Sequence, residues 1–362
     1  MTYTFCTKGS IEQIGKLEQD SEFDDFGFEV YLRDPTHIQD IKQDERIVTI
    51  HNPKVVDAEN HYFTLADYGD VGNTSENVLK EMLEKATQEN IPKLVVHADV
   101  AEVSFNKKSC QEEQNLVANR IVEAYSSIYP RHSCNHVTLC LENNPLSSFE
   151  LSLGKSVLVS PSDFYNIRNQ IWDRGKIQVP IQPVIDIEHV YRSSFLFILE
   201  NQIKEILSDK EPNKSLTYSP KPQGELSTIK EIEDLISRTL FSNCSYYKEK
   251  AERHLENYIE SLLPHVKTFH VCGFDMFQDR CYDEQGNFWF PGAHLPPFFE
   301  GEISGIKITD EIDHRRYLKQ LQGLLNNFNF ILEFNQRVKY DHKKQTLKSK
   351  LHFEDILLQN SH

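Results

Sequence analysis

The chain has 362 residues, of which 39% are hydrophobic, and it carries a formal net charge of −16. This length suits one large domain or two ordinary ones, with enough apolar residues for a substantial core. The acidic residues are spread along the chain, which argues against a broad nucleic-acid-binding face because phosphate contacts need clustered Lys and Arg.

The spacing of the cysteines and the lack of long apolar runs indicate in which cellular compartment the protein is expected. The seven cysteines form no close pairs of the kind that hold structural zinc or a redox centre. Residues 1–20 are too polar for a signal peptide, and no run of about 18 apolar residues is available to span a bilayer. These features predict a soluble, cytoplasmic protein with no membrane partner.

Polar and apolar segments alternate from the beginning of the chain. Residues 1–24 are polar and acidic, and we expect them to form an N-terminal arm or a helix across the bottom of the barrel. The first strand is predicted over residues 26–32, and Pro35 follows it, because proline cannot donate into a sheet ladder. The second strand is predicted over residues 47–51 and is closed by Pro53 in the same way.

Helical periodicity separates the strands that follow. Apolar residues recur at three- and four-residue spacing over 75–89 and again over 111–129, which predicts two amphipathic helices. A third helix is predicted to begin after Ser160, with an Asp three residues later as in a capping box, and to bury Trp172. Since strands and helices alternate, the sheet is predicted to be parallel.

A residue able to bind a metal ion stands at the end of six apolar runs. These residues are His51, His97, Glu142, Asp186, His270 and Glu333. The first four are separated by 46, 45 and 44 residues, so one structural unit repeats and presents a polar side chain at the same end each time. The pattern predicts an α/β fold, a single (β/α)8 TIM barrel, in which all strand ends meet at one mouth. Such a cluster would repel itself unless a cation neutralised it, so a metal site is predicted there.

The regular spacing breaks once, in the 84 residues between Asp186 and His270. We predict an insertion over about residues 201–245, between the predicted fifth and sixth strands, as a lid, a dimer contact or a loose loop. The barrel as a whole is predicted to span residues 25–362. Residues 272–299 are rich in aromatics, Gly and Pro, which predicts a long loop at the mouth.

Four motifs together resemble a known family. They are Leu141-Glu142-Asn143-Asn144, Ile185-Asp186-Ile187-Glu188-His189, Phe269-His270-Val271, and Pro291-Gly292-Ala293-His294 followed by Glu300-Gly301-Glu302. In their order, spacing and strand positions they resemble the xylose isomerase-like TIM barrels, over most of residues 26–340. That superfamily includes endonuclease IV-type DNA-repair enzymes and many sugar isomerases and epimerases.

The resemblance implies a set of metal ligands. The core site shared by both branches would be Glu142, Asp186, His270 and Glu333. The endonuclease IV branch adds four histidines and holds three zinc ions, and the corresponding residues here are His51, His97, His189 and His294. That branch also has an Asp where this chain has Gly292, so a third ion held by His189 and His294 would be weak and two ions are expected. Imidazole mixed with carboxylate favours Zn, with Mn, Fe or Co as alternatives.

Three functions stay open at this point. The first is endonuclease IV-like hydrolysis of a phosphoester by metal-bound hydroxide, for which His51 and His97 would complete a two-metal site. The second is a sugar or sugar-phosphate isomerase or epimerase that uses one metal, with Glu142 and Glu333 as acid and base. The third is a non-catalytic binding module.

The substrate and the oligomeric state are less defined. In the isomerase alternative, His189, Arg192 and Arg280 would contact the substrate. A small phosphorylated or sugar-like substrate is favoured over nucleic acid, because the chain is acidic and has Asn52-Pro53-Lys54 where an endonuclease would place aromatic wedges. The sequence indicates no particular oligomeric state.

Overall fold

The structure is a computed structural model that describes residues 2–98, 110–129, 137–144, 157–174, 178–199, 244–275, 281–282, 288–289, 294–303, 306–321, 326–334 and 341–359. Residues 201–243, which make up most of the predicted insertion, lie outside these ranges, as do Arg280 and Gly292.

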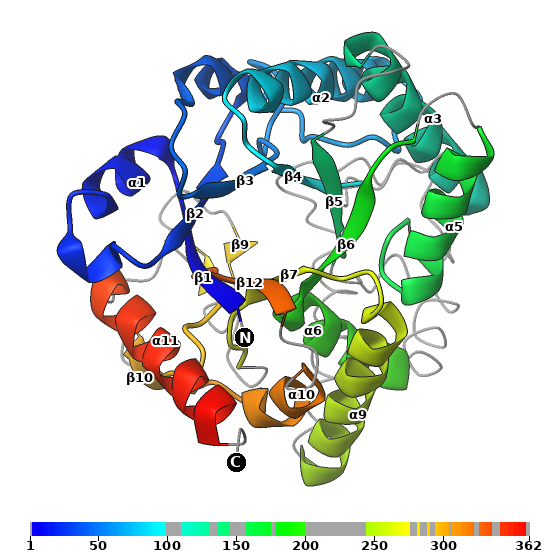
Figure 1. Cartoon of the computed structure of the whole chain (residues 1–362). Helices are drawn as coiled ribbons and strands as arrows, with labels where there is room; N and C mark the ends of the chain where they lie inside the picture. The colour runs from blue at the N-terminus through cyan, green and yellow to red at the C-terminus, as the bar shows by residue number, and fades with distance from the viewer. Residues whose placement is uncertain are drawn as a thin grey trace.

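Eight parallel strands form a closed barrel at the centre of the molecule (Figure 1). In chain order they are β1 (Thr2–Gly9), β2 (Gly27–Tyr31), β3 (Ile47–His51), β4 (Lys93–His97), β5 (Thr138–Glu142), β6 (Ile181–Asp186), β7 (Thr268–Val271) and β12 (Asn326–Leu332). Each strand pairs with its two neighbours in parallel, and β1 pairs with both β2 and β12 to close the ring. The predicted (β/α)8 barrel is confirmed.

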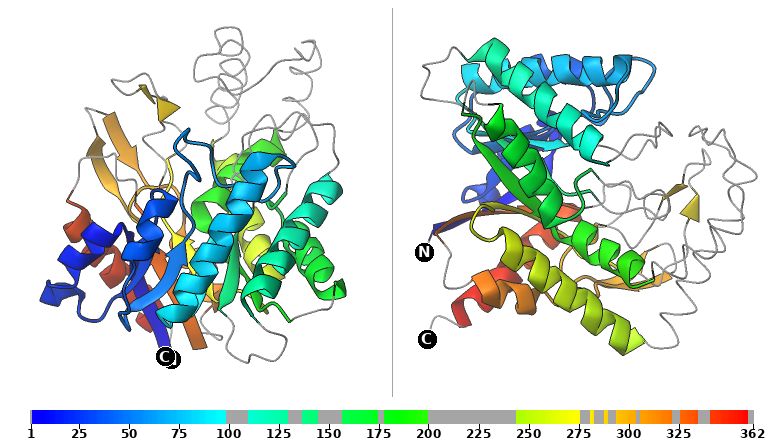
Figure 2. Two further views of the ribbon diagram at one scale, coloured as in Figure 1. Left: turned by 90° about the horizontal axis from the view of Figure 1, so that it is seen from above. Right: turned by 90° about the vertical axis from the view of Figure 1, so that its right-hand side faces the viewer.

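Helices lie around the outside of this ring (Figure 2). They are α1 (Ile11–Leu17), α2 (Asp70–Gln88), α3 (Cys110–Ile128), α5 (Pro161–Asp173), α6 (Ile187–Ile198), α9 (Cys244–Leu262), α10 (His314–Leu321) and α11 (His342–Gln359), with 3-10 turns η1 (Ser21–Phe23) and η2 (Pro35–Asp40). The short strands β8 (Cys281–Tyr282) and β9 (Phe288–Trp289) form one antiparallel pair, and β10 (Glu300–Ile303) and β11 (Ile306–Thr309) form another. None of the described helices is both long and apolar enough to cross a lipid bilayer.

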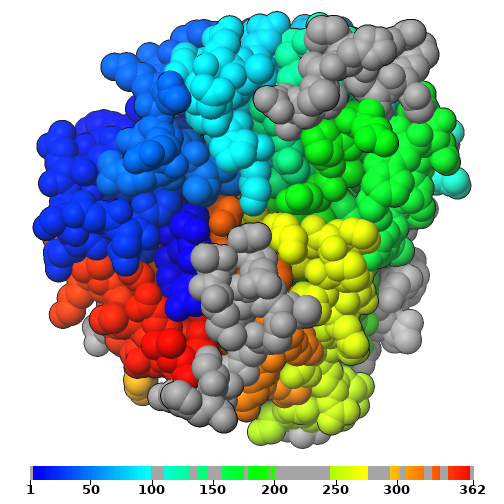
Figure 3. Space-filling model, viewed as in Figure 1, coloured from blue at the N-terminus to red at the C-terminus, as the bar shows by residue number. Residues whose placement is uncertain are grey.

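The segment predicted as an N-terminal arm or a helix contains helix α1, but the prediction misses the first barrel strand. Thr2–Gly9 is β1, and its backbone pairs with β12 on one side and β2 on the other. The alternating Thr, Cys and Lys of this strand lack the apolar run that marks the other strands. The chain therefore goes once around the molecule, and its first and last segments are neighbours (Figure 3).

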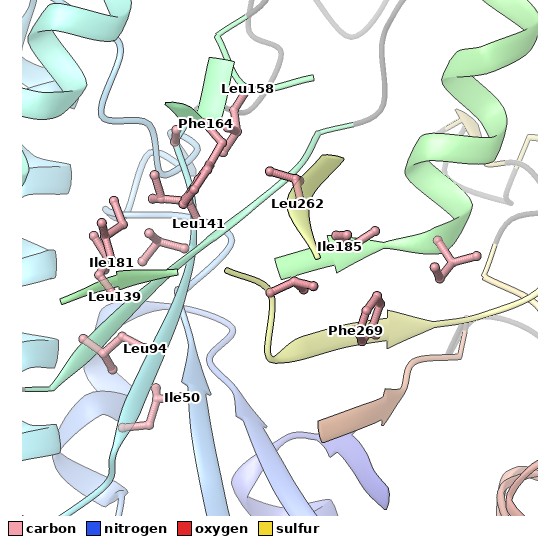
Figure 4. Close-up of a cluster of buried hydrophobic side chains, with 14 of the residues drawn as sticks. Ile50, Leu94, Leu139, Leu141, Leu158, Phe164, Ile181, Ile185, Leu262 and Phe269 are labelled. Atoms are coloured by element: carbon pink, nitrogen blue, oxygen red, sulfur yellow. The ribbon is translucent and has the colours of Figure 1, made fainter. Parts of the chain in front are cut away.

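Apolar side chains on the outer face of the strands pack against the helices. Figure 4 shows Leu139 and Leu141 of β5 and Ile181 of β6 near Phe164, which belongs to α5. The predicted capping box at the start of α5 is present, with Ser160 as the N-cap. Fully burying a side chain of this size contributes about 1.5–3 kcal/mol, so these contacts hold the barrel and its helices together.

Trp172 departs from this pattern, because it is 47% exposed although its burial was predicted. The buried stripe of α5 runs through Phe164, Ile167 and Ile171, which leaves the next position at the edge of the helix. There the guanidinium of Arg168 lies 3.7 Å from the centre of the indole ring.

The inner face of the barrel carries a separate small cluster, Val95, Cys140 and Val184. Each of the three stands two residues before the last residue of its strand. Because alternate residues of a strand share one face, those last residues, His97, Glu142 and Asp186, also belong to the inner face.

Candidate metal centre

The carboxyl ends of the strands bring the eight predicted metal-binding residues together. The last residues of β3, β4, β5 and β6 are His51, His97, Glu142 and Asp186, while His270 lies in β7 and Glu333 follows β12. The ligand atoms of these residues form overlapping groups in which all atoms lie within 4.8 Å of one another. The groups include His51 with His97 and Glu142; Glu142 with Asp186, His270 and Glu333; and Asp186 with Glu188, His189 and His294.

Two histidines face the same carboxylate oxygen. His51 donates from Nδ1 to the carbonyl of Asn52 at 3.0 Å, and its Nε2 lies 3.0 Å from Glu142 Oε2. His97 donates from Nδ1 to Asn144 Oδ1 at 2.8 Å, and its Nε2 lies 3.5 Å from the same Glu142 oxygen. Metal-binding histidines are usually fixed in this way, with one ring N–H donated to an oxygen and the other nitrogen free for the ion.

A hydrogen bond from one ring nitrogen to an oxygen also fixes the orientation of His189, which lies in the first turn of α6. Its Nδ1 donates to the carbonyl of Asn143 at 2.8 Å, which leaves Nε2 at 3.7 Å from both Asp186 Oδ2 and Glu188 Oε2. The helix begins directly at the strand end, where Asp186 caps it by accepting from the His189 backbone N–H at 3.0 Å. The end of β6 and the start of α6 thus fix the Asp186 and His189 side chains relative to each other.

His270 stands between carboxylates on opposite sides of the barrel. Its Nε2 lies 3.3 Å from Glu29 Oε2, which also accepts from the Thr49 hydroxyl at 2.7 Å. The other ring nitrogen, Nδ1, lies 3.1 Å from Glu142 Oε1 and 3.1 Å from Glu333 Oε2. Glu29 therefore orients His270 so that Nδ1 faces the two carboxylates.

Lys8 places a positive charge beside these carboxylates. Its ammonium group donates to Glu333 Oε2 at 2.8 Å and lies 3.5 Å from Glu29 Oε1. The attraction of these two carboxylates outweighs burial and raises the pKa of Lys8, so the side chain stays charged.

The pKa shifts at the site reflect burial opposed by strong pairing. Burial favours the neutral form of Glu142, yet the nearby His270 and His97 hold its pKa well below the usual range. Burial would lower the pKa of His270, but Glu142 and Glu29 raise it well above the usual value. Burial lowers the pKa of His97 to about 4, so this imidazole is neutral at pH 7, as a metal ligand must be.

Several buried polar atoms here have no hydrogen-bond partner among the described residues. They are Glu29 Oε1, Asp186 Oδ2, both carboxylate oxygens of Glu188 and His270 Nδ1. Each unpaired buried group costs about 1–3 kcal/mol, and more if it is charged. Bound cations would satisfy the atoms of Asp186, Glu188 and His270, whereas Glu29 Oε1 lies 3.5 Å from the Lys8 ammonium. Mixed imidazole and carboxylate donors suit divalent transition metals. The residues present therefore fit the kind of ion that the sequence predicts.

Among the charged residues at this site, Lys8, Glu29 and Glu188 are given no role by the sequence motifs. Glu29 lies in the middle of β2 rather than at its end, and Lys8 lies in the polar segment for which no strand is predicted. The only signal for Glu29 and Lys8 in the sequence was that each is a single charged residue within a strand. Of the two predicted substrate-binding arginines, Arg192 lies on α6, where its Nη1 is 3.9 Å from Glu188 Oε1.

No protein-family model matches this chain, and no curated protein is similar enough to be counted a match. Solved structures do match. A putative xylose isomerase from Rhodospirillum rubrum is 11% identical, with 100% of both chains covered and a TM-score of 0.55. The apo form of a 3-keto-D-glucoside 4-epimerase from E. coli is 9% identical, with 98% of this chain and 99% of that chain covered and a TM-score of 0.50.

An endonuclease IV from Thermus thermophilus is 13% identical, with 99% of this chain and 100% of that chain covered and a TM-score of 0.48. The matches to the putative xylose isomerase and the epimerase, at 11% and 9% identity, indicate a shared fold alone, and the reaction has to be argued from the site.

Proposed function

We propose that this chain, whose fold is that of the xylose isomerase-like TIM barrels, is a metal-dependent enzyme that hydrolyses a phosphoester. The observation that carries the proposal is the position of Glu142 between two sets of histidines. Its Oε2 faces His51 at 3.0 Å and His97 at 3.5 Å, whereas its Oε1 faces His270 at 3.1 Å. A carboxylate placed in this way is suited to bridge two ions.

The chain supplies separate ligands on each side of this bridge. His51 and His97 would hold one ion, and Asp186, His270 and Glu333 would hold the other, with zinc favoured by the donor atoms. A pair of such ions supplies an activated water near neutral pH and a clamp for a phosphoryl oxygen. Asn52, Asn144 and Glu29 keep the imidazoles in position for this chemistry through the hydrogen bonds described above.

The substrate is proposed to be small and phosphorylated or sugar-like. Arg192, which is half-buried on α6, would neutralise an anionic group of such a substrate. A net charge of −16 disfavours duplex DNA, since its phosphates would be repelled by most of the surface.

A second candidate function has one observation in its favour. Glu142 Oε1 and Glu333 Oε2 both lie 3.1 Å from His270 Nδ1, so the two carboxylates approach the same point. With a single ion there, they could move a proton between adjacent carbons of a sugar, as an isomerase or epimerase requires. In that reaction His51 and His97 would not be needed.

Replacement of those two histidines separates the candidates. In a hydrolase, His51→Ala and His97→Ala should each lower the turnover of bis(p-nitrophenyl) phosphate by about 100-fold or more and remove about one bound zinc per chain. His265→Ala is a matched control, because this histidine lies before the amino end of β7 and contacts Arg168. If both variants keep wild-type turnover and metal content, hydrolysis by a metal pair is excluded. Solvent deuterium incorporation into ketose sugars, unaffected by these variants, would support the isomerase.

A further inference from the structure

A pocket of about 450 Å³ lies between α3 and α5, which are neighbours in the outer ring of helices (Figure 1). This volume falls within the range of about 300–1,000 Å³ that is usual for small-molecule sites. Polar side chains line the pocket and form one stripe on each helix, because they recur at three- or four-residue spacing. They include Cys110 and Gln114 of α3 and Asp163, Asn166, Asn169 and Gln170 of α5. None of the lining residues belongs to a metal-ligand group of the described residues, so the pocket is separate from the metal centre.

The pocket lies toward the end of the barrel that carries the metal centre. Tyr125, near the end of α3, donates to the carbonyl of Val137, directly before β5, at 2.6 Å. At the other end of that strand, the Asn144 backbone N–H donates to the carbonyl of Leu158, shortly before α5, at 2.9 Å. The first turns of both helices, which line the pocket, are therefore at the carboxyl ends of the strands.

Gln114 fixes the wall of the pocket. It is 2% exposed, and its Nε2 lies 2.9 Å from Asp163 Oδ1, 3.2 Å from the Val157 carbonyl oxygen and 3.3 Å from Cys110 Sγ. Its Oε1 accepts from the Asn166 side chain at 3.4 Å. These contacts join α3 to α5 and hold the lining side chains in place before a ligand arrives, which lowers the cost of ordering them on binding.

Gln170 supplies a hydrogen-bonding group that the protein leaves unused. Its Oε1 is buried and has no hydrogen-bond partner among the described residues. Buried polar atoms are nearly always hydrogen-bonded, and leaving one unpaired costs free energy. A donor from a bound molecule would satisfy this oxygen.

Carboxamides make up five of the seven lining side chains. Each offers both N–H donors and a carbonyl acceptor. A hydroxyl group also donates and accepts, so a molecule with several hydroxyls matches such a lining. We propose that this pocket is a binding site for a neutral polyhydroxylated molecule, a monosaccharide or a polyol.

Charged and apolar ligands fit the pocket poorly. None of the described residues that line it is Lys, Arg or His, and Asp163 would repel an anion. A cation would have to displace existing bonds, because Asp163 Oδ1 accepts from Gln114 and its Oδ2 accepts from the backbone N–H groups of Ser160 at 2.7 Å and Val159 at 3.1 Å. The described lining also contains no aromatic or aliphatic side chain, so an apolar ring would find no stacking partner.

Chemical protection of Cys110 tests the inference. The thiol is partly exposed and lines the pocket, so its alkylation by iodoacetamide, followed by peptide mass spectrometry, reports on occupancy. The probes are D-glucose, D-xylose and myo-inositol, each titrated into zinc-loaded protein. At about nine times its dissociation constant, at least one of them should slow the alkylation about 10-fold, because only the unoccupied pocket reacts. D-Glucose 6-phosphate is the charged control and should give no protection.

Two substitutions remove hydrogen-bonding groups from the pocket and nearly preserve the size of the side chain. Asn169→Leu and Gln170→Met should each raise the dissociation constant of the protecting probe by about 10-fold. Asn169 is exposed on the helix, so its replacement is not expected to disturb folding, and circular dichroism verifies that both variants are folded. The matched control is Asn257→Leu, at an exposed position of α9 outside the pocket, which should leave the protection unchanged.

The inference is overturned if none of the three probes slows the alkylation, or if the protection is the same in wild type and in both pocket variants. The test is separate from that of the proposed function. His51→Ala removes a proposed metal ligand that lies outside the pocket, so this variant should keep the full protection even where it loses hydrolysis. Loss of protection in His51→Ala would place the sugar at the metal centre and would also overturn the inference.

Discussion

The Lys8 ammonium donates a hydrogen bond of 2.8 Å to Glu333, which joins the first barrel strand to the end of the last. Both side chains are largely buried, and Glu29 lies on the other side of the lysine at 3.5 Å. Lys8 therefore supplies part of the positive charge that the carboxylate cluster needs.

Lys8→Met should destabilise the metal-free protein. The substitution keeps most of the length of the side chain but leaves two buried carboxylates without their cation, and breaking a buried pair in this way costs about 3 kcal/mol. A bound metal ion compensates for the lost charge, so the difference from wild type should shrink when zinc is added. Urea denaturation with and without zinc measures both effects.

Lys16→Met provides the control for this prediction. Lys16 pairs with Glu12 on α1, where both side chains are exposed, and its loss should have little effect on stability. Metal-free Lys8→Met as stable as wild type would show that Lys8 does not balance the cluster.

Glu29→Gln should weaken metal binding without removing a ligand. Glu29 accepts from the Thr49 hydroxyl and lies 3.3 Å from His270 Nε2, so it fixes the orientation and basicity of that imidazole. Loss of such a partner typically lowers metal affinity by about 10–100-fold. Competition with a fluorescent zinc chelator gives the affinity, and Glu12→Gln on α1 is the exposed control. Equal affinities for Glu29→Gln and wild type would refute a positioning role.

Asn143→Ala should loosen the strand end that carries Asp186. The Asn143 side chain accepts from the Asp186 backbone N–H at 2.7 Å and donates to the Asp186 carbonyl at 3.3 Å. Loss of both hydrogen bonds should cost about 1–3 kcal/mol of stability and reduce zinc affinity. Thermal unfolding and zinc titration measure the two effects. Asn166→Ala, which removes a 3.4 Å contact to Gln114 on the outer helices, should leave zinc affinity unchanged.

Glu252 should make stability depend on pH. Burial raises the pKa of Glu252 to about 7, although its Oε1 accepts from the Asp313 backbone N–H. The folded state then holds a proton that the unfolded state releases at lower pH, so stability should fall as the pH rises from about 4.5 to about 7 and then level off. Glu252→Gln should abolish this decline.

At pH 8 we expect the Glu252→Gln variant to be more stable than wild type by on the order of 1–3 kcal/mol, because no charge is buried there. Urea denaturation at pH 5, 6, 7 and 8 gives the curve. A wild type whose stability rises across this range, with a variant that follows it in parallel, would contradict the prediction.

The sequence predicts the barrel and its mouth well, because both follow from short-range patterns. The nearly constant sequence spacing of His51, His97, Glu142 and Asp186 indicates a repeating strand-and-helix unit. In the structure each of these four residues is the last residue of its strand. The capping pattern at Ser160 correctly predicts the start of α5. Signals of this kind depend on a few neighbouring residues and need no knowledge of the tertiary contacts.

What the sequence misses depends on contacts between distant strands. Thr2–Gly9 looks polar because alternate residues face a polar barrel interior, and its partner β12 lies at the far end of the sequence. Glu29 looks like an ordinary charged residue of a two-faced strand until the closed ring places it opposite His270. The sequence motifs assign no role to the side chains of Asn52 and Asn143, whereas the Oδ1 atom of each accepts a hydrogen bond from a backbone N–H of a neighbouring strand, His97 for Asn52 and Asp186 for Asn143.

The ring is closed by β1 and β12, in which Thr2 pairs with Asn326 and Thr7 with Leu332. During synthesis on a ribosome, β1 emerges before the other strands of the barrel and can pair with β12 only after all of them have been made. Until then the nascent sheet presents two open edges, which are the surfaces through which unfinished chains aggregate. Glu333 arrives with the same late strand, so closure of the ring and completion of the ligand set are one folding event.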